Sequence, residues 1–238
     1  MRFMVMHKMT AEMEQGLPPS PEVIEGVNGL IGEAIGQGIF LGGEGLKPSG
    51  QRSHLAYRDG RRSITDGPFA DQGQLPAGFA VLRVRSREQA VACCDRLAAA
   101  AGDLAIHLGP VHEPWDLGFG DKPADAPERY LALPEADAAS ERDQPAFASD
   151  RVAALLAVMR EEGVVEASGA LAGTRHGARI RMPGGKVTVL DGPFAESKEL
   201  VAGYAILELP SLGAAIEFSI RFGHVVQVDE IDIRLVHA

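Results

Sequence analysis

The pentapeptide DGPFA occupies residues 66–70 and recurs unchanged at residues 191–195. The two occurrences are 125 residues apart, and this offset holds without a gap from about residue 26 to residue 112. It pairs, for example, Leu30 with Leu155. Coincidence does not explain one offset over such a length, so the sequence predicts two copies of one domain. Two copies are too few for a solenoid, which needs about three or more repeats.

The repeat also predicts where the domains begin and end. We expect a first domain at residues 1–114, a linker at residues 115–128 and a second domain at residues 129–238. The linker is punctuated by Pro, Gly and Asp, as segments between domains commonly are. A chain of 238 residues suits two small domains.

Each copy reads as β-α-β-β-α-β with extra hairpin length in the middle. In the first copy, the strand-like residues 3–7 precede a helix that begins at Ser20, a favourable N-cap followed by Pro and Glu. The Asp-Gly pair at residues 59–60 separates two short strands, which is typical of a hairpin. A second helix begins at Ser86, which is followed three residues later by Gln, the pattern of a capping box. This order predicts an α+β fold of two ferredoxin-like units, each an antiparallel sheet with helices on one face.

Composition argues against several classes of protein. Hydrophobic residues make up 45% and charged residues 24%, as in globular proteins. The net charge of −10 argues against a surface for duplex nucleic acid, and no apolar run approaches a membrane helix or a signal peptide. The two cysteines, Cys93 and Cys94, are adjacent and match no zinc spacing. We therefore expect a cytoplasmic protein without nucleic-acid or membrane partners.

Two longer motifs resemble a known family. Residues 191–200 read DGPFAESKEL and are followed by Gly203-Tyr204, while residues 42–49 read GGEGLKPS ahead of the first hairpin. Together they resemble the YCII-related family, specifically its DGPF branch, and the resemblance covers nearly the whole chain as a tandem duplication. It implies ferredoxin-like domains that pair through their sheets. The two copies would then form an intramolecular dimeric α/β barrel, and a further homodimer stays open.

The resemblance implies less about activity. Some YCII-like members are thought to be enzymes that use a His–Asp pair in a cleft to act on small organic molecules. DGPF proteins are also associated with extracytoplasmic-function sigma factors. The histidine that the family places on the first helix is missing here, since neither residues 20–38 nor residues 149–163 contain one.

Asp66, Asp191 and His54 are the candidates for catalytic residues. A carboxylate in a cleft serves as a general acid or base when its surroundings move its pKa toward the working pH. His54 is a candidate because histidine is the side chain whose ordinary pKa lies closest to physiological pH. The alternative for both aspartates is a structural turn, because Asp-Gly-Pro is a turn signature. The alternative for His54 is a solvated outer strand.

Further residues are candidates for ligand binding. Cationic side chains suit a carboxylate ligand, and glycines let the backbone approach a ligand at Glu44. The candidates are Glu44, Arg52, Arg61, Lys186, Lys198 and Tyr204. No cofactor and no metal are expected, because the chain has no P-loop and the histidines near strand ends lack the spacing of metal ligands. These histidines are His107, His112, His224 and His237.

The function that the sequence favours is the binding of a small organic molecule, with Asp-based acid–base chemistry of the lyase or isomerase type. The alternative is a non-catalytic regulatory or protein-interaction module linked to sigma-factor systems. The sequence leaves open whether the chain is an enzyme. Because the two copies differ around the DGPF motif, we expect two unequal clefts or one cleft that uses parts of both copies. Converging Asp and His or Arg side chains would favour the first function, and an exposed apolar patch the second.

Overall fold

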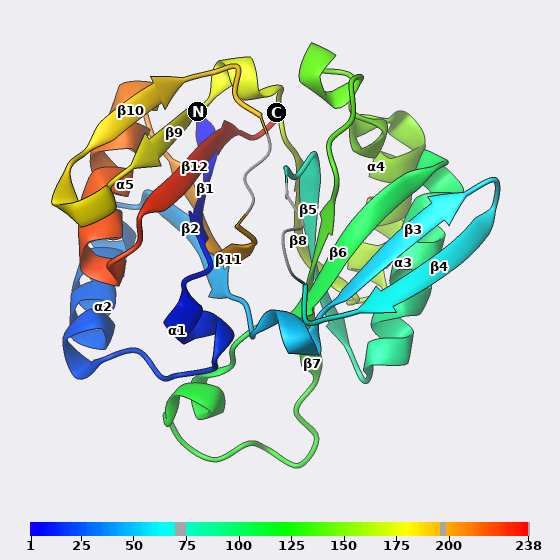
Figure 1. The fold of residues 1–238 in the computed structure, drawn as a ribbon. Coiled ribbons are helices and arrows are strands. Elements are labelled where there is room, and N and C mark those ends of the chain that lie inside the picture. The colour runs from blue at the N-terminus through cyan, green and yellow to red at the C-terminus, as the bar shows by residue number, and fades with distance from the viewer. Residues whose placement is uncertain (70–74, 196–198, 238) are drawn as a thin grey trace. The chain divides into compact units, whose positions relative to one another are not determined.

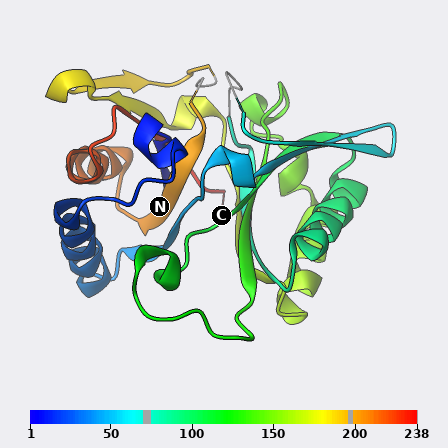
Figure 2. The same cartoon turned by 60° about the horizontal axis from the view of Figure 1, so that its bottom comes forward.

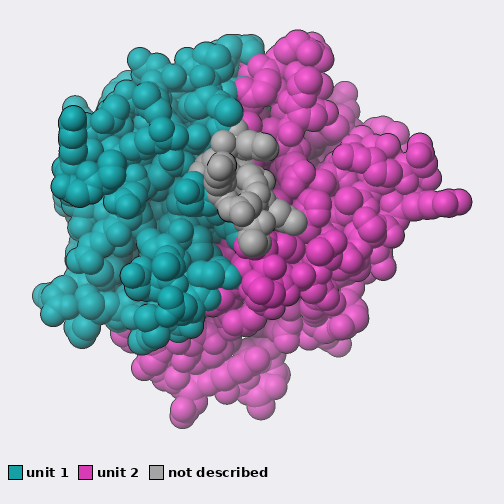
Figure 3. Space-filling model, viewed as in Figure 1, with its two compact units in different colours: residues 1–45, 71–74, 172–238 teal, residues 46–70, 75–171 magenta. Residues whose placement is uncertain are grey.

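The structure is a computed structural model that describes residues 1–69, 75–195 and 199–237 (Figure 1). Its strands form two six-stranded antiparallel sheets, and helices pack on each sheet. The mixed α+β class is therefore confirmed. Clustering of the fold separates two compact units, which are coloured in Figure 3.

Unit 1 combines the two ends of the chain. Its described part is residues 1–45, 172–195 and 199–237. Its elements are β1 (Arg2–Lys8), α1 (Ala11–Glu14), α2 (Pro21–Gly36), β2 (Phe40–Gly45), β9 (Ala178–Arg181), β10 (Thr188–Asp191), β11 (Val201–Glu208), α5 (Leu212–Val226) and β12 (Glu230–Leu235). The strand order is β10-β9-β12-β1-β11-β2, so the N-terminal strand lies between two strands from the C-terminal region (Figure 1).

Unit 2 is built from the middle of the chain. Its elements are β3 (Ser53–Arg58), β4 (Arg61–Asp66), β5 (Gly78–Val84), α3 (Arg87–Ala101), β6 (Leu104–Pro110), β7 (Glu128–Pro134), α4 (Asp150–Glu161) and β8 (Val165–Ala170). The strand order, β4-β3-β6-β7-β5-β8, repeats that of unit 1 when corresponding strands are matched. Short 3-10 helices complete the described chain at Ser49–Gln51, Pro114–Leu117, Ser140–Arg142, Ala146–Ala148, Thr174–His176 and Pro183–Gly185.

The compact units do not coincide with the sequence repeats. Each unit takes a β-α-β segment from one half of the chain and a hairpin-β-α-β segment from the other half, and the chain crosses between units after residues 45 and 171. The long ladders of β1 with β11 and of β5 with β7 hold this arrangement together. The expected boundaries at residues 114 and 129 thus describe the repeats, whereas strand pairing divides the chain elsewhere.

Local signals account for the helix starts and the hairpin. The Ser20 hydroxyl accepts a hydrogen bond from the backbone of Val23, and the Ser86 hydroxyl accepts one from Gln89. The Gln89 side chain in turn accepts from the backbone of Arg85, one residue earlier than a capping box requires. The turn at residues 59–60 has positive φ at both positions, as the predicted hairpin requires.

The helices of each unit cover one face of its sheet, with α2 beside α5 and α3 beside α4 (Figure 2). In unit 1, Phe3 and Val5 of β1 join the core under the helices. Successive strand residues point to opposite faces, so Met4 and Met6 lie on the other face, where they are also fully buried. A polar side chain on that second, buried face therefore needs a polar partner. No helix among the described residues is long and apolar enough to cross a membrane.

Candidate functional site

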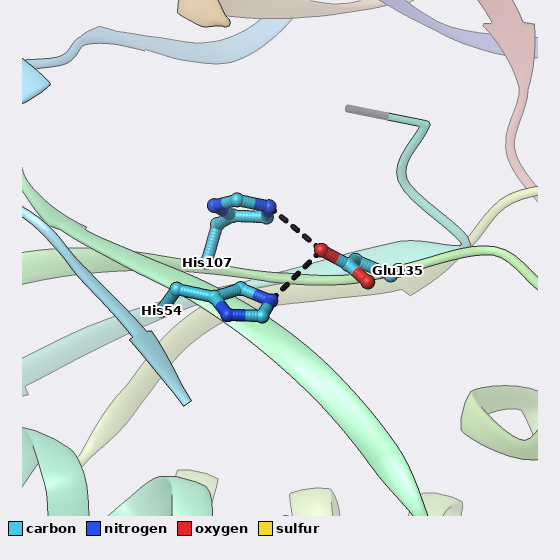
Figure 4. Close-up of side chains that lie close together, drawn as sticks. All are labelled: His54, His107 and Glu135. Atoms are coloured by element: carbon cyan, nitrogen blue, oxygen red, sulfur yellow. Dashed lines mark hydrogen bonds and ion pairs between the residues drawn. The ribbon is translucent and has the colours of Figure 1, made fainter. Parts of the chain in front are cut away.

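Three polar side chains meet on the helix-free face of the unit 2 sheet (Figure 4). His54 of β3 lies directly opposite His107 of β6 in the antiparallel register, and Glu135 follows the end of β7. Oε1 of Glu135 lies 3.0 Å from Nε2 of His54 and 2.8 Å from Nε2 of His107. The two imidazole rings are 4.7 Å apart between centroids. We call this group the His–Glu centre.

The His–Glu centre is buried at one end and open at the other. His107 is buried, whereas the side chains of His54 and Glu135 are 22% and 34% exposed. Burial acts to raise the pKa of Glu135, but the imidazoles of His107 and His54 outweigh it and lower that pKa to about 2. The carboxylate therefore stays ionised at physiological pH, and solvent reaches the centre at His54 and Glu135.

The DGPF motif holds an aromatic ring against the centre. Phe69 meets the His107 ring edge-on, with 6.0 Å between centroids and an interplanar angle of 88°. Its backbone N–H donates a hydrogen bond to the hydroxyl of Ser49. A side chain at Gly67 would collide with the Ser49 carbonyl, so only glycine lets the loop approach this closely.

Neither candidate aspartate is a member of the His–Glu centre. Asp66 accepts a hydrogen bond from Ser53 at 2.8 Å and forms an ion pair with Arg87 of α3. Ser53 precedes His54 in β3, so its side chain points to the opposite face of the sheet. Asp66 thus lies on the helix side of unit 2, and Asp191 is an exposed residue at the end of β10 in unit 1.

The described ligand-binding candidates are divided between the two units. Arg52 is buried in unit 2 and donates a hydrogen bond from Nε to the Lys47 carbonyl at 2.6 Å. Arg61 and Lys186 are exposed. In unit 1, Glu44 and Tyr204 are partners across the β2–β11 ladder, while Lys198 falls outside the described residues.

Unit 1 carries a different set of side chains at the three corresponding positions. The 125-residue offset relates His54 to Arg179 and His107 to Asp232, and these two are again register partners. Lys8 corresponds to Glu135, because Lys8 pairs with Val201 where Glu135 pairs with Pro76, 125 residues before Val201. The two units therefore carry different polar side chains at these matched positions of their sheets.

The unit 1 group, which we call the Lys–Asp–Arg network, is a closed set of ion pairs. Asp232 lies 2.8 Å from Nζ of Lys8 and 2.6 Å from Nε of Arg179, and all three side chains are buried. Burial acts to raise the pKa of Asp232, but the two cations keep it below its usual value. Phe194, the DGPF aromatic of this copy, lies 4.6 Å from the Arg179 guanidinium. Each carboxylate and cation of this network is paired within it, so it suits a structural role.

Sequence reasoning found His54 but missed Glu135 and did not group His107 with it. Linear spacing contains no sign of the centre, because its members come from three strands. The sequence predicts no metal site, yet the structure gathers three potential ligand atoms within 4.8 Å of one another. The available signal was the aligned repeat, in which both histidines are replaced by charged residues that form an ion pair.

Fold and site together define a mixed α+β protein with antiparallel sheets and, in the part of the chain that the structure describes, one histidine–carboxylate centre. In comparisons with known proteins, the family model of the YCII-related domain matches residues 129–223. No curated protein and no solved structure matches the chain. A YCII-related domain is therefore present at residues 129–223, which begin where the second repeat is expected to begin. This segment contributes Glu135 and α4 to unit 2 and β9 to β11 to unit 1.

Proposed function

We propose that the chain is a tandem YCII-related protein of the DGPF type that binds a small organic molecule at the His–Glu centre and transfers a proton there. The observation that carries the proposal is the convergence of two imidazoles on one carboxylate, with one imidazole partly open to solvent. The corresponding site of unit 1 is closed by fixed charges and has a structural role in this proposal.

The duplication is supported by the matching strand orders and by the matching positions of the two polar groups. Each unit contains strands in the order that a ferredoxin-like repeat requires, with the hairpin added at one edge. The dimeric α/β barrel within one chain follows from the family resemblance and is part of the proposal.

The chemistry follows from the contacts of Glu135. A carboxylate that accepts from one nitrogen of an imidazole fixes its tautomer and stabilises the imidazolium that forms when the other nitrogen takes a proton. In this proposal Nε2 of His54 donates to Glu135, and Nδ1 accepts a proton from the bound molecule and returns it to another atom of the same molecule. Reactions of this kind are isomerisations and eliminations. Asp66 takes no part, because it is engaged by Ser53 and Arg87.

A thermal-shift screen against small organic acids, lactones and phenols tests the proposal. A ligand at about 100 times its dissociation constant stabilises the folded state by roughly 2.7 kcal/mol, which raises the melting temperature by several degrees. We expect His54→Gln to abolish that shift. His224→Gln, which changes an exposed histidine of α5, should keep it. A shift that survives in His54→Gln would place the ligand elsewhere.

A second candidate function, a protein-interaction module, is favoured by one observation. The edge strand β10 exposes Val189 and Leu190. An edge strand can accept an added strand from another chain. Self-association by sedimentation equilibrium that Val189→Lys abolishes would support pairing of two copies through this edge. A single monomer mass at every concentration would argue against it.

A further inference from the structure

We infer that His54, His107 and Glu135 form a binding site for one divalent transition-metal ion of the Zn²⁺ or Co²⁺ type. This inference deepens the proposed function at the same centre and rests on it for the reaction, although metal binding can be measured independently. Its starting point is the separation of the three potential ligand atoms, which all lie within 4.8 Å of one another (Figure 4).

The present distances between the ligand atoms are close to those that a bound ion requires. Bonds of about 2.0–2.1 Å in a tetrahedral site separate neighbouring ligand atoms by about 3.3 Å. The two nitrogens now lie 3.0 Å and 2.8 Å from the same carboxylate oxygen. Small rotations of the partly exposed His54 and Glu135 side chains would open the required space, while the buried His107 stays in place.

His107 provides a second observation that points to a missing partner. The side chain is 5% exposed, and its Nε2 has no hydrogen bond of acceptable geometry within the described chain although it faces Glu135. A buried polar atom ordinarily has a partner. Nε2 is also the atom through which a neutral imidazole binds a metal.

The unit 1 network shows that a buried carboxylate at this place in the fold is neutralised by positive charge. There the carboxylate of Asp232 is flanked by two permanently charged groups, Lys8 and Arg179. Unit 2 also has one carboxylate, but it stands at the Lys8 position and is flanked by two imidazoles, which carry no fixed charge. A bound divalent cation supplies positive charge beside Glu135 while the imidazoles stay neutral.

The donor set selects the kind of ion. Two imidazoles and one carboxylate suit zinc and neighbouring transition metals, whereas Mg²⁺ and Ca²⁺ prefer oxygen ligands. Three protein ligands leave a coordination position for water or for an oxygen of the bound molecule. The ion would polarise a carbonyl or carboxylate oxygen of the bound molecule, and a hydroxide formed from water at the open position would accept the proton in place of Nδ1 of His54. The ligand class is therefore small molecules with a hydroxy, oxo or carboxylate oxygen.

The test is titration of the chelator-treated full chain with Co²⁺, followed by visible absorption and by calorimetry. We expect one Co²⁺ per chain with the intense d–d bands of a four- or five-coordinate site, and no competition from Mg²⁺. His54→Arg, which introduces the residue of the corresponding unit 1 position, should weaken Co²⁺ binding at least tenfold and keep the fold, because arginine can pair with Glu135. Glu135→Gln should weaken binding similarly, and His224→Gln should leave it unchanged.

The outcomes separate this inference from the proposed function. Absence of stoichiometric Co²⁺ binding, or unchanged binding in His54→Arg, would overturn the metal site. A small-molecule thermal shift that persists in metal-free protein would then leave the proton-transfer proposal standing. Stoichiometric Co²⁺ binding that depends on His54, without any small-molecule shift, would support the metal site and count against the proposed function.

Discussion

The two units put three polar side chains at corresponding positions of corresponding strands, yet the two groups behave as opposites. In unit 1 the carboxylate of Asp232 sits between two fixed cations, and every member is buried. In unit 2 the carboxylate of Glu135 sits between two imidazoles, and two of the three members are partly exposed. The first group is complete without any other molecule, and the second has an open side.

In the proposed function, this difference assigns a stabilising role to the unit 1 group and chemistry to the unit 2 group. Buried permanent charges must be fully paired, because an unpaired charge costs several kcal/mol. Imidazoles are buried neutral at a lower cost and can gain a proton or an ion near neutral pH. The Lys–Asp–Arg network therefore cannot change any member without loss of stability, whereas the His–Glu centre is the group to which our proposed function assigns proton transfer.

Each of the two groups is contacted by the phenylalanine of a DGPF loop. Phe69 packs edge-on against His107, and Phe194 packs against the Arg179 guanidinium. In both copies the Phe backbone N–H donates to a hydroxyl, that of Ser49 or of Thr174. The motif thus positions an aromatic ring on whichever polar group the sheet carries.

The largest expected effect is the loss of the unit 1 carboxylate. Asp232→Asn leaves Lys8 and Arg179 buried with an uncharged partner, so we expect the free energy of unfolding to fall by about 3–5 kcal/mol. The matched variant in unit 2, His107→Asn, should cost only about 1 kcal/mol. Urea denaturation of both variants measures the difference. Equal losses would contradict the division into a structural and a reactive group.

The pH dependence of stability tests the ion pairs of Asp232 in a second way. The pKa of Asp232 is lower in the folded state than its ordinary value of 3.8, so the folded state binds fewer protons than the unfolded state in this range. The stabilisation is complete above pH 3.8 and is lost as the pH falls through the folded-state pKa. Unfolding followed between neutral pH and pH 2 should show a flatter acid limb in Asp232→Asn, and an unchanged acid limb would refute the assignment.

A smaller and symmetric effect is expected at the DGPF glycines. An alanine Cβ would collide with the Ser49 carbonyl in Gly67→Ala and with the Thr174 carbonyl in Gly192→Ala. Each substitution should cost about 1–3 kcal/mol, as overpacking commonly does. Thermal unfolding of both variants checks this, and a large loss in only one copy would show that the loops do not serve the same role.

The smallest effect is expected at Asp66. Its ion pair with Arg87 is largely exposed, so Asp66→Asn should cost less than about 1 kcal/mol and leave any small-molecule thermal shift in place. Melting curves with and without the ligand provide the measurement. Loss of the ligand-induced thermal shift in a folded Asp66→Asn protein would show that the Asp66 carboxylate belongs to the binding site.

Local patterns predicted the elements well. The helix starts at Ser20 and Ser86 and the hairpin at residues 59–60 were all foreseen, because caps and tight turns depend on contacts within a few residues. The short helix α1 was not foreseen, since four residues in a polar stretch have no periodic pattern. His54 was identified as a titratable residue, but its partners were not.

Short-range residue chemistry thus accounts for the α+β class and for the strands and helices of each unit. Strand pairing decides the composition of the units and of the site. It combines segments from both halves of the chain in each compact unit, and it brings His54 and His107 opposite each other beside Glu135. Ladders are built from backbone groups that nearly every residue carries, so side-chain patterns do not specify which strands become neighbours. A site assembled from β3, β6 and the end of β7 exists only once those strands have paired.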